Sequence, residues 1–215
     1  MDVISLKKNI IIIGHYGSGK SEIAVNLAIN EGYKAIVDLD VVNPYFRPSD
    51  IINEMKELGI DVIASDYASS NVDVPALPSR INTVFDKNIP AIFDVGGDAE
   101  GATVLGRYAN KLKDNYEMIM VVNACRPLTQ SKEQIIEMMK EIELVSKLKI
   151  TKIINNTNLL EQTGIEDLLK AEEMLESFTD VWKISGFANI LDELPQKYNS
   201  KKIVLERRIK YNGAY

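Results

Sequence analysis

The segment Ile10–Ala28, which reads IIIIGHYGSGKSEIAVNLA, constrains the fold more than any other stretch of this chain. Four isoleucines come first, a glycine-rich loop follows, and the run after the loop has helical character. A continuous β-branched run is typical of a central parallel strand that is buried on both faces of its sheet. The segment therefore predicts a strand, a tight loop and a helix, in that order.

Apolar runs and helical patterns continue to alternate along the rest of the chain. Further strands are predicted over residues 34–40, 61–65, 90–97, 116–124, 151–157 and 180–185. Helices are predicted over residues 21–30, 48–58, 76–87, 100–113, 129–148 and 165–177. This alternation favours an α/β fold, with a doubly wound and mostly parallel sheet of about seven strands flanked by helices.

The chain is long enough to form one sizeable core. It has 215 residues, 46% of them hydrophobic, and it shows no internal repeat and no proline-rich linker. Single α/β domains of this length are ordinary, so we expect one domain over residues 1–215. The segment 201–215 is ambiguous, since it fits either a terminal strand or helix, or a loosely attached tail.

Charge and cysteine content exclude several classes of protein. The net charge is -6 and the charged residues are scattered, so no nucleic-acid partner is expected. The single cysteine, Cys125, allows no disulfide within the chain, disfavours a thiolate metal cluster, and is expected to be a small core residue. The start of the chain does not resemble a signal peptide, and no apolar run reaches the roughly 18 residues of a membrane span. We therefore expect a cytoplasmic protein that does not bind a membrane.

The glycine-rich loop fits the pattern G-x-x-x-x-G-K-S/T, and its place between a strand and a helix is the context in which that pattern holds phosphates. Glycines let backbone N–H groups turn toward phosphate oxygens, and the following helix offers its positive end. Lys20 is expected to reach the β- and γ-phosphates, and the Ser21 hydroxyl to bind Mg²⁺. The predicted nucleotide-binding residues of this loop are Gly14, His15, Tyr16, Gly17, Ser18, Gly19, Lys20 and Ser21.

Two other stretches carry acids where predicted strands end. A phosphate-binding loop needs a second carboxylate beside the metal, and in AIFDVGGDAEG we predict that Asp94 supplies it. Gly97 is placed to contact the γ-phosphate through its N–H, and Asp98 to orient water. In IVDLD, Asp40 is expected to contact water or Mg²⁺, while Asp38, on the same face, either joins it or bonds loop amides. The predicted catalytic residues are thus Lys20, Asp40 and Asp98, and the predicted metal ligands Ser21, Asp40 and Asp94.

Together these residues resemble the branch of P-loop NTPases that includes the MinD/ParA partitioning ATPases and the nitrogenase iron protein. The resemblance covers the chain from Asn9 to about Ile190. VDLDVVNPYFR is similar to the first switch of that family, and DVGGDAEGA resembles the second switch of the iron protein. Asn155 looks like the asparagine that contacts the base. The resemblance implies a nucleotide-driven switch, often a dimer with two nucleotides facing each other across the interface.

The chain departs from that family at three places. His15 occupies the position where many relatives carry a lysine that reaches across the dimer. Gly101 stands where the iron protein has its cluster cysteine, so a redox cluster is disfavoured. Leu205–Tyr211 is too short and too weakly amphipathic to match the membrane-binding segment of some relatives.

The sequence constrains the nucleotide base and the type of reaction less than it constrains phosphate binding. In NNTN, Asn158 stands where guanine recognition would place an aspartate, which favours ATP over GTP, although plain turn chemistry also explains the asparagines. The preferred hypothesis is an Mg²⁺-dependent ATPase that switches its contact with a partner, either a second copy or an unidentified protein. The alternatives are a small-molecule kinase or ATP-dependent ligase with residues 65–80 as a substrate loop, and a nucleotide-sensing module without hydrolysis. A kinase usually needs arginines that converge on both phosphoryl groups. Few arginines of this chain fall near strand-end loops, which makes the kinase the less favoured hypothesis; they are Arg47, Arg80, Arg107 and Arg126.

Overall fold

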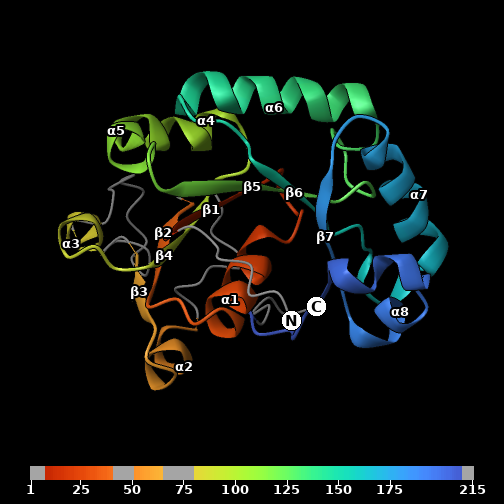
Figure 1. Cartoon of the computed structure of the whole chain (residues 1–215), viewed down its shortest axis with the longest axis horizontal. Helices are drawn as coiled ribbons and strands as arrows, with labels where there is room; N and C mark the ends of the chain where they lie inside the picture. The colour runs from red at the N-terminus through yellow and green to blue at the C-terminus, as the bar shows by residue number, and fades with distance from the viewer. Residues whose placement is uncertain (1–7, 41–50, 65–79, 210–215) are drawn as a thin grey trace, which may run out of the picture.

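The computed structural model describes residues 8–40, 51–64 and 80–209, which form a single parallel sheet with helices on both faces (Figure 1). The eight strands in this part of the chain run in the order β3-β2-β4-β1-β5-β6-β7-β8. They are β1 (Asn9–Ile13), β2 (Ala35–Leu39), β3 (Asp61–Ile63), β4 (Ala91–Val95), β5 (Tyr116–Val122), β6 (Lys152–Asn155), β7 (Val181–Gly186) and β8 (Lys202–Val204). The predicted α/β class with a doubly wound parallel sheet is confirmed.

The helices divide between the two faces of the sheet. One face is covered by α1 (Lys20–Asn30) and α2 (Ile52–Glu57), and the other by helices that include the long α6 (Lys132–Ser146) (Figure 1). The remaining helices are α3 (Ile81–Asp86), α4 (Ala99–Ala102), α5 (Ala109–Leu112), α7 (Ile165–Glu176) and α8 (Ala188–Asp192), with short 3₁₀ turns at Thr103–Arg107, Leu160–Gln162 and Gln196–Lys201. In the part of the chain that is described, no helix combines the length and the apolar character that crossing a bilayer requires.

The four isoleucines of β1 join the two cores. Ile10 and Ile12 pack with α1, whereas Ile11 and Ile13 pack with the α6 side, because successive strand side chains point to opposite faces. All four are fully buried. Complete burial of such a side chain contributes roughly 2 kcal/mol before entropy is counted. The prediction of a central strand buried on both faces is confirmed.

The predicted helix 100–113 is broken into α4, a 3₁₀ turn and α5. Two glycines explain the break, since both make backbone contacts that an ordinary side chain would block. A Cβ on Gly101 would lie 2.7 Å from the backbone of Gly96, and one on Gly106 would lie 3.0 Å from the carbonyl oxygen of Val145 in α6. Glycine is also a weak helix former, so this segment follows the packing rather than a regular helix.

The end of the sheet differs from the predicted seven strands by one short edge strand. β8 pairs with β7, with Lys202 opposite Ile184 and Val204 opposite Gly186. A strand of three residues carries too little alternation to be recognised in a sequence. Of the ambiguous segment 201–215, residues 201–209 are described here, and residues 210–215 lie outside the described part.

The strand order fixes where a ligand can bind. From β1 the chain first winds toward β2 and β3, and after β4 it crosses to β5 and continues toward β8. Ligands of open parallel sheets bind at the carboxyl ends of the strands, at the point where the winding direction reverses. That point is the end of β1, where the glycine-rich loop begins.

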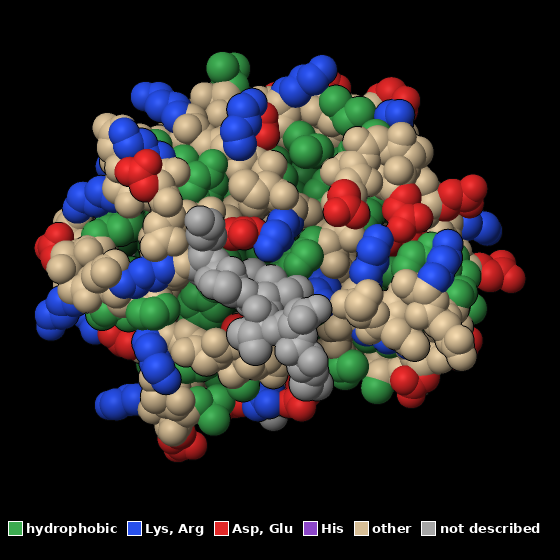
Figure 2. Space-filling view, in the orientation of Figure 1, with side chains coloured by type: hydrophobic (Ala, Val, Ile, Leu, Met, Phe, Trp, Pro, Cys, Tyr) green, Lys and Arg blue, Asp and Glu red, His purple; other side chains and the backbone are tan. Residues whose placement is uncertain are grey.

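The surface charges are mixed. On the face shown in Figure 2, basic and acidic side chains of the described residues are interspersed among polar and apolar ones.

Candidate functional site

The glycine-rich loop is a tight turn between β1 and α1. Gly17 and Gly19 have φ values of 75° and 86°, a region that side chains rarely adopt. Gly19 also caps α1, and a Cβ there would lie 2.3 Å from the amide nitrogen of Asn156. Backbone conformation therefore favours glycine at both positions, and at Gly19 the space allows no side chain.

Lys20, the first residue of α1, is buried and paired with an acid. Its ammonium lies 2.9 Å from a carboxylate oxygen of Asp40, and both side chains are only 4% exposed. Asp40 follows β2 directly, and its backbone N–H donates to the Asp38 carboxylate at 3.2 Å. Two side chains predicted to work at the phosphate end are thus brought together by α1 and β2.

Asp94 lies in β4, in register with Asp38 of β2 and Ile12 of β1, and its side chain is completely buried. Burial raises its pKa from 3.8 to about 6, against the lowering effects of the Lys20 ammonium and the Ser21 hydroxyl. Ser21 is close enough to act on this pKa, yet neither carboxylate oxygen completes a hydrogen bond of normal geometry within the described residues. A buried, unsatisfied carboxylate beside a hydroxyl is a donor set that suits Mg²⁺.

Within the described residues, protein side chains alone do not form a complete metal site. No group of three or more His, Cys, Asp or Glu side chains is arranged to hold a metal ion in residues 8–40, 51–64 and 80–209. Magnesium bound together with a nucleotide needs only one or two protein ligands, because phosphates and water supply the others. Ser21 and Asp94 fit that requirement.

The segment after β4 packs directly on the loop. A Cβ on Gly97 would lie 2.1 Å from the carbonyl oxygen of Gly14, so only glycine fits. Asp98 caps α4 by accepting a hydrogen bond from the Gly101 N–H at 2.7 Å. Burial and the Lys20 charge lower the pKa of His15, while the Asp98 carboxylate raises it. Gly97 therefore packs on the loop and Asp98 lies near His15, while their roles toward the γ-phosphate and water stay predictions.

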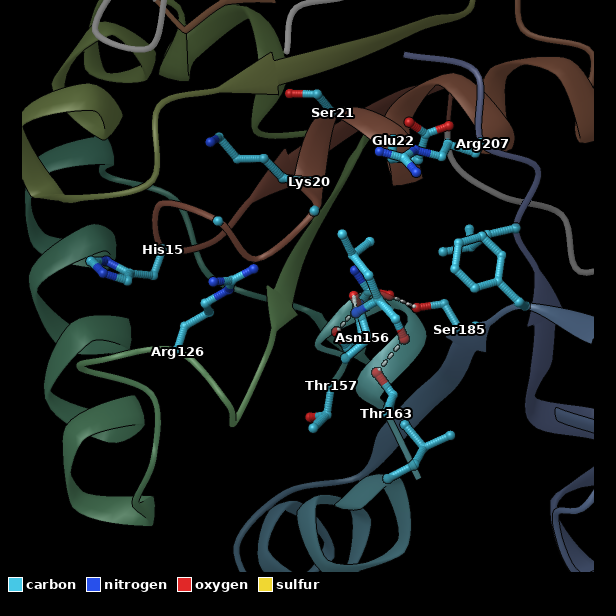
Figure 3. Close-up of a pocket in the computed structure, with 18 of the residues that line it drawn as sticks. His15, Lys20, Ser21, Glu22, Arg126, Asn156, Thr157, Thr163, Ser185 and Arg207 are labelled. Carbon is cyan, nitrogen blue, oxygen red and sulfur yellow. Dashed lines mark hydrogen bonds between the residues drawn. The ribbon is translucent and has the colours of Figure 1, made fainter. Parts of the chain in front are cut away.

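A cavity of about 560 Å³ opens beside the loop. Figure 3 shows Lys20 and Ser21 on one side of it and Asn156, Thr163 and Ser185 on the opposite side. The far end is lined by apolar side chains that include Leu160, Phe187, Ile190, Leu205 and Ile209. The cavity thus has a polar phosphate-binding end and a largely apolar end.

Asn155 does not line this cavity. Its amide is buried below the cavity and donates to the Leu168 carbonyl at 3.2 Å and to the Glu172 carboxylate at 3.0 Å. The next residue, Asn156, donates to the Ser18 carbonyl at 2.7 Å and accepts from the Ser185 hydroxyl at 2.9 Å. The structure therefore brings Asn156 to the loop and to the cavity lining, whereas Asn155, the residue predicted to contact the base, lies outside that lining.

The missed role of Asn156 had a weak signal in the sequence. Two consecutive asparagines end the predicted strand, and their side chains must point to opposite faces. The sequence does not show which of the two faces the phosphate loop.

One wall of the cavity comes from residues 205–209, which we call the C-terminal strap. The Glu22 carboxylate of α1 accepts hydrogen bonds from the N–H groups of Arg208, at 2.6 Å, and Ile209, at 3.1 Å. Asn26, one turn further along α1, bonds both the N–H and the carbonyl of Glu206, at 2.9 and 3.0 Å. Because α1 begins at the phosphate loop, the same helix anchors both the loop and the wall.

Two hypotheses from the sequence fall outside this description. Arg47 and the rest of NPYFR, and the proposed substrate loop up to residue 79, lie outside the described residues. Arg80 is described, and it pairs with Asp61 at the surface, 2.5 Å away. Cys125 is half-buried, and burial raises the pKa of its thiol.

The parallel sheet, the loop at its switch point and the helices on both faces define a P-loop α/β fold. Solved structures share it. The signal recognition particle receptor FtsY from Elizabethkingia anophelis matches 86% of this chain with a TM-score of 0.52 and 14% identity. Chloroplast FtsY from Physcomitrella patens matches 82% with a TM-score of 0.52 and 15% identity.

These likenesses concern the fold. The chain covers 59% of the Elizabethkingia receptor and 57% of the chloroplast protein, so it spans less than two thirds of either. No protein-family model and no curated protein sequence matches the chain. The resemblance to MinD/ParA ATPases remains a prediction from the motifs.

Proposed function

We propose that this protein binds ATP with Mg²⁺, hydrolyses it, and uses the nucleotide state to change its contact with a partner protein. The observation that carries the proposal is the phosphate end of the cavity. There the loop and the buried Lys20 line the cavity at the switch point of the sheet, and the unsatisfied carboxylate of Asp94 is buried close to Lys20 and Ser21.

Each residue has a defined part in this proposal. The N–H groups of the loop and the positive end of α1 bind phosphate oxygens. Lys20 neutralises phosphate charge, and Ser21 and Asp94 hold Mg²⁺, which when bound neutralises the charge that develops on the phosphates. Asp98 orients the attacking water, and the backbone N–H of Gly97 contacts the γ-phosphate.

The Lys20–Asp40 pair supplies a physical basis for switching. A phosphate and the Asp40 carboxylate compete for the same ammonium, which lies 2.9 Å from Asp40 in this structure. Nucleotide binding therefore loosens a buried ion pair between α1 and the end of β2. Breaking such a pair is costly. The nucleotide-free and nucleotide-bound states therefore differ in free energy, and a partner protein that binds one state more tightly can distinguish them.

The residues that line the cavity favour ATP over GTP as the bound nucleotide. Among its lining residues in the described chain, Glu22 is the one acid, and its carboxylate already accepts two backbone hydrogen bonds from the strap. Guanine presents N1–H and amino donors that are best matched by a carboxylate, whereas adenine can be served by amides, hydroxyls and backbone groups. GTP remains the second candidate, because one Elizabethkingia FtsY structure is a complex with GDP.

Nucleotide turnover tests the proposal. Purified protein is mixed with Mg²⁺ and either ATP or GTP, and phosphate release is measured alongside molecular mass with and without nucleotide. We expect slow ATP hydrolysis without a second substrate and loss of ATP binding in Lys20→Ala. Asp40→Ala should lose hydrolysis but still bind ATP, because it lacks the predicted catalytic acid and frees the Lys20 ammonium for phosphate. Turnover only with an added small substrate would favour a kinase or ligase, and binding without turnover a sensing module. Normal binding and hydrolysis in both variants would refute the site.

A further inference from the structure

The loop after β5 places an arginine on the phosphate loop. A Cβ on Gly17 would lie 3.3 Å from Nε and 3.5 Å from Cδ of Arg126, so the arginine side chain covers the glycine closely. Arg126 also lines the cavity, and Figure 3 shows it beside the loop that carries His15. Gly17 is thus a glycine for two reasons, its φ of 75° and the space that Arg126 occupies.

Hydrogen bonds fix the turn that presents this arginine. The Arg126 N–H donates to the Asn123 carbonyl at 3.0 Å, and the Thr129 hydroxyl donates to the same carbonyl at 2.8 Å. The Asn123 side chain accepts from the N–H groups of Cys125 and Asn158 and donates to the Asn158 carbonyl at 2.8 Å. The turn is therefore tied to the loop after β6, which borders the cavity, and Arg126 is held in place.

The charge of Arg126 lacks a counterion in this part of the molecule. Among the described residues its guanidinium makes no ion pair and no hydrogen bond, and Nε is buried without a partner. Lys20, by contrast, has Asp40. Burial raises the pKa of the Glu22 carboxyl, and the positive charge of Arg207 lies near enough to oppose that rise. A buried donor without an acceptor is costly, so the cavity contains a cationic group that a bound anion would satisfy.

We infer that Arg126 is a phosphate-binding residue that donates to a phosphate oxygen of the bound nucleotide from within the same chain. The inference rests on the proposed nucleotide binding and adds a cation to it that the loop motif does not include. Arginine suits this task because its planar fork of donors matches phosphate oxygens and keeps its charge at any physiological pH. Arg126 therefore recognises the phosphate part of the ligand and not the base.

Affinities for ADP and for adenosine, measured by calorimetry with Mg²⁺, test this role. We expect Arg126→Ala to weaken ADP binding about 10- to 100-fold, the value of a charge-assisted hydrogen bond, and to leave adenosine binding unchanged. Arg126→Lys should recover part of the loss. Arg107→Ala is the matched control, since Arg107 is exposed and lies outside the cavity lining.

Three results would overturn the inference in different ways. Equal loss of ADP and adenosine affinity would mean that Arg126 stacks on the base. Unchanged ADP affinity in Arg126→Ala, with binding still lost in Lys20→Ala, would mean that Arg126 only packs on Gly17, and the proposed function would stand. No nucleotide binding by the unmodified protein would refute both. If Arg126→Ala does not fold, Arg126→Gln keeps the aliphatic stem against Gly17 and serves in its place.

Discussion

Replacing Asp94 with asparagine should make the protein more stable while it impairs the site. Asp94 is fully buried, and its pKa is about 6 in the folded chain against 3.8 in the unfolded one. At neutral pH the folded protein therefore holds a buried charge that the unfolded chain exposes to water. An asparagine side chain has nearly the shape of the protonated acid and no charge, so Asp94→Asn removes that cost.

The magnitude and sign follow from linkage. Each pKa unit corresponds to about 1.4 kcal/mol, so the rise to about 6 predicts a gain of roughly 2 to 3 kcal/mol at pH 7. Because the folded-state pKa of Asp94 is raised, its contribution to stability is fully present below pH 3.8 and is lost as pH rises through about 6. The advantage of Asp94→Asn should thus be small near pH 4 and reach its full value above pH 6.

Urea denaturation in EDTA, without nucleotide, measures this difference at pH 4.5 and pH 7. Asp114→Asn is the control, because Asp114 is exposed and its loss should change the free energy of unfolding little at either pH. With Mg²⁺ and ATP added, the order should reverse, since only the unmodified protein gains the metal contact. The reasoning fails if Asp94→Asn is the less stable protein at pH 7, or if its advantage is the same at both pH values.

Three further outcomes are expected. Lys20→Ala should cost about 3 to 5 kcal/mol of stability by breaking the buried ion pair with Asp40. The double variant with Asp40→Asn should regain most of that in denaturation and still bind no ATP; an equally unstable double variant would contradict the pairing. Gly97→Ala should weaken ATP binding at least about tenfold, because its Cβ would meet the Gly14 carbonyl at 2.1 Å and only the backbone can give way; unchanged calorimetric affinity would argue against the contact. Because burial lowers the pKa of His15, its imidazole should be neutral above pH 7, and ATP affinity should not change between pH 7 and pH 9. A change of affinity in that range that is absent in His15→Gln would show instead that the imidazole is protonated at pH 7.

Most of the fold could be predicted because it depends on local patterns. The run Ile10–Ile13 has the composition of a doubly buried strand, and the alternation of strands and helices leaves few topologies other than a parallel sheet. The broken helix around Gly101 and Gly106 could not be predicted, since its cause is contact with Gly96 and with α6, segments that the local pattern does not contain.

The candidate site shows the same contrast between features set by local motifs and features set by long-range contacts. Lys20, Ser21 and Asp94 are predicted from short motifs, and in the structure Lys20 and Ser21 line one end of the cavity while Asp94 is buried close to both. The roles of Asn156 and Arg126 depend on contacts with Ser18 and Gly17, more than a hundred residues away in the chain. Such long-range contacts leave no periodic trace in a single sequence, and so the sequence pointed to Asn155 and left Arg126 without a role.

The C-terminal strap has a consequence for the newly made protein. A chain emerges from the ribosome with its N-terminal end first, so the phosphate loop, Lys20 and Asp94 are available long before residues 205–209. Until those residues appear, Glu22 and Asn26 have no strap to hold and the cavity is open along α1. A nascent chain therefore carries the phosphate-binding motif before this wall of the cavity is in place, and under the proposed function tight nucleotide binding begins only once residues 205–209 have emerged.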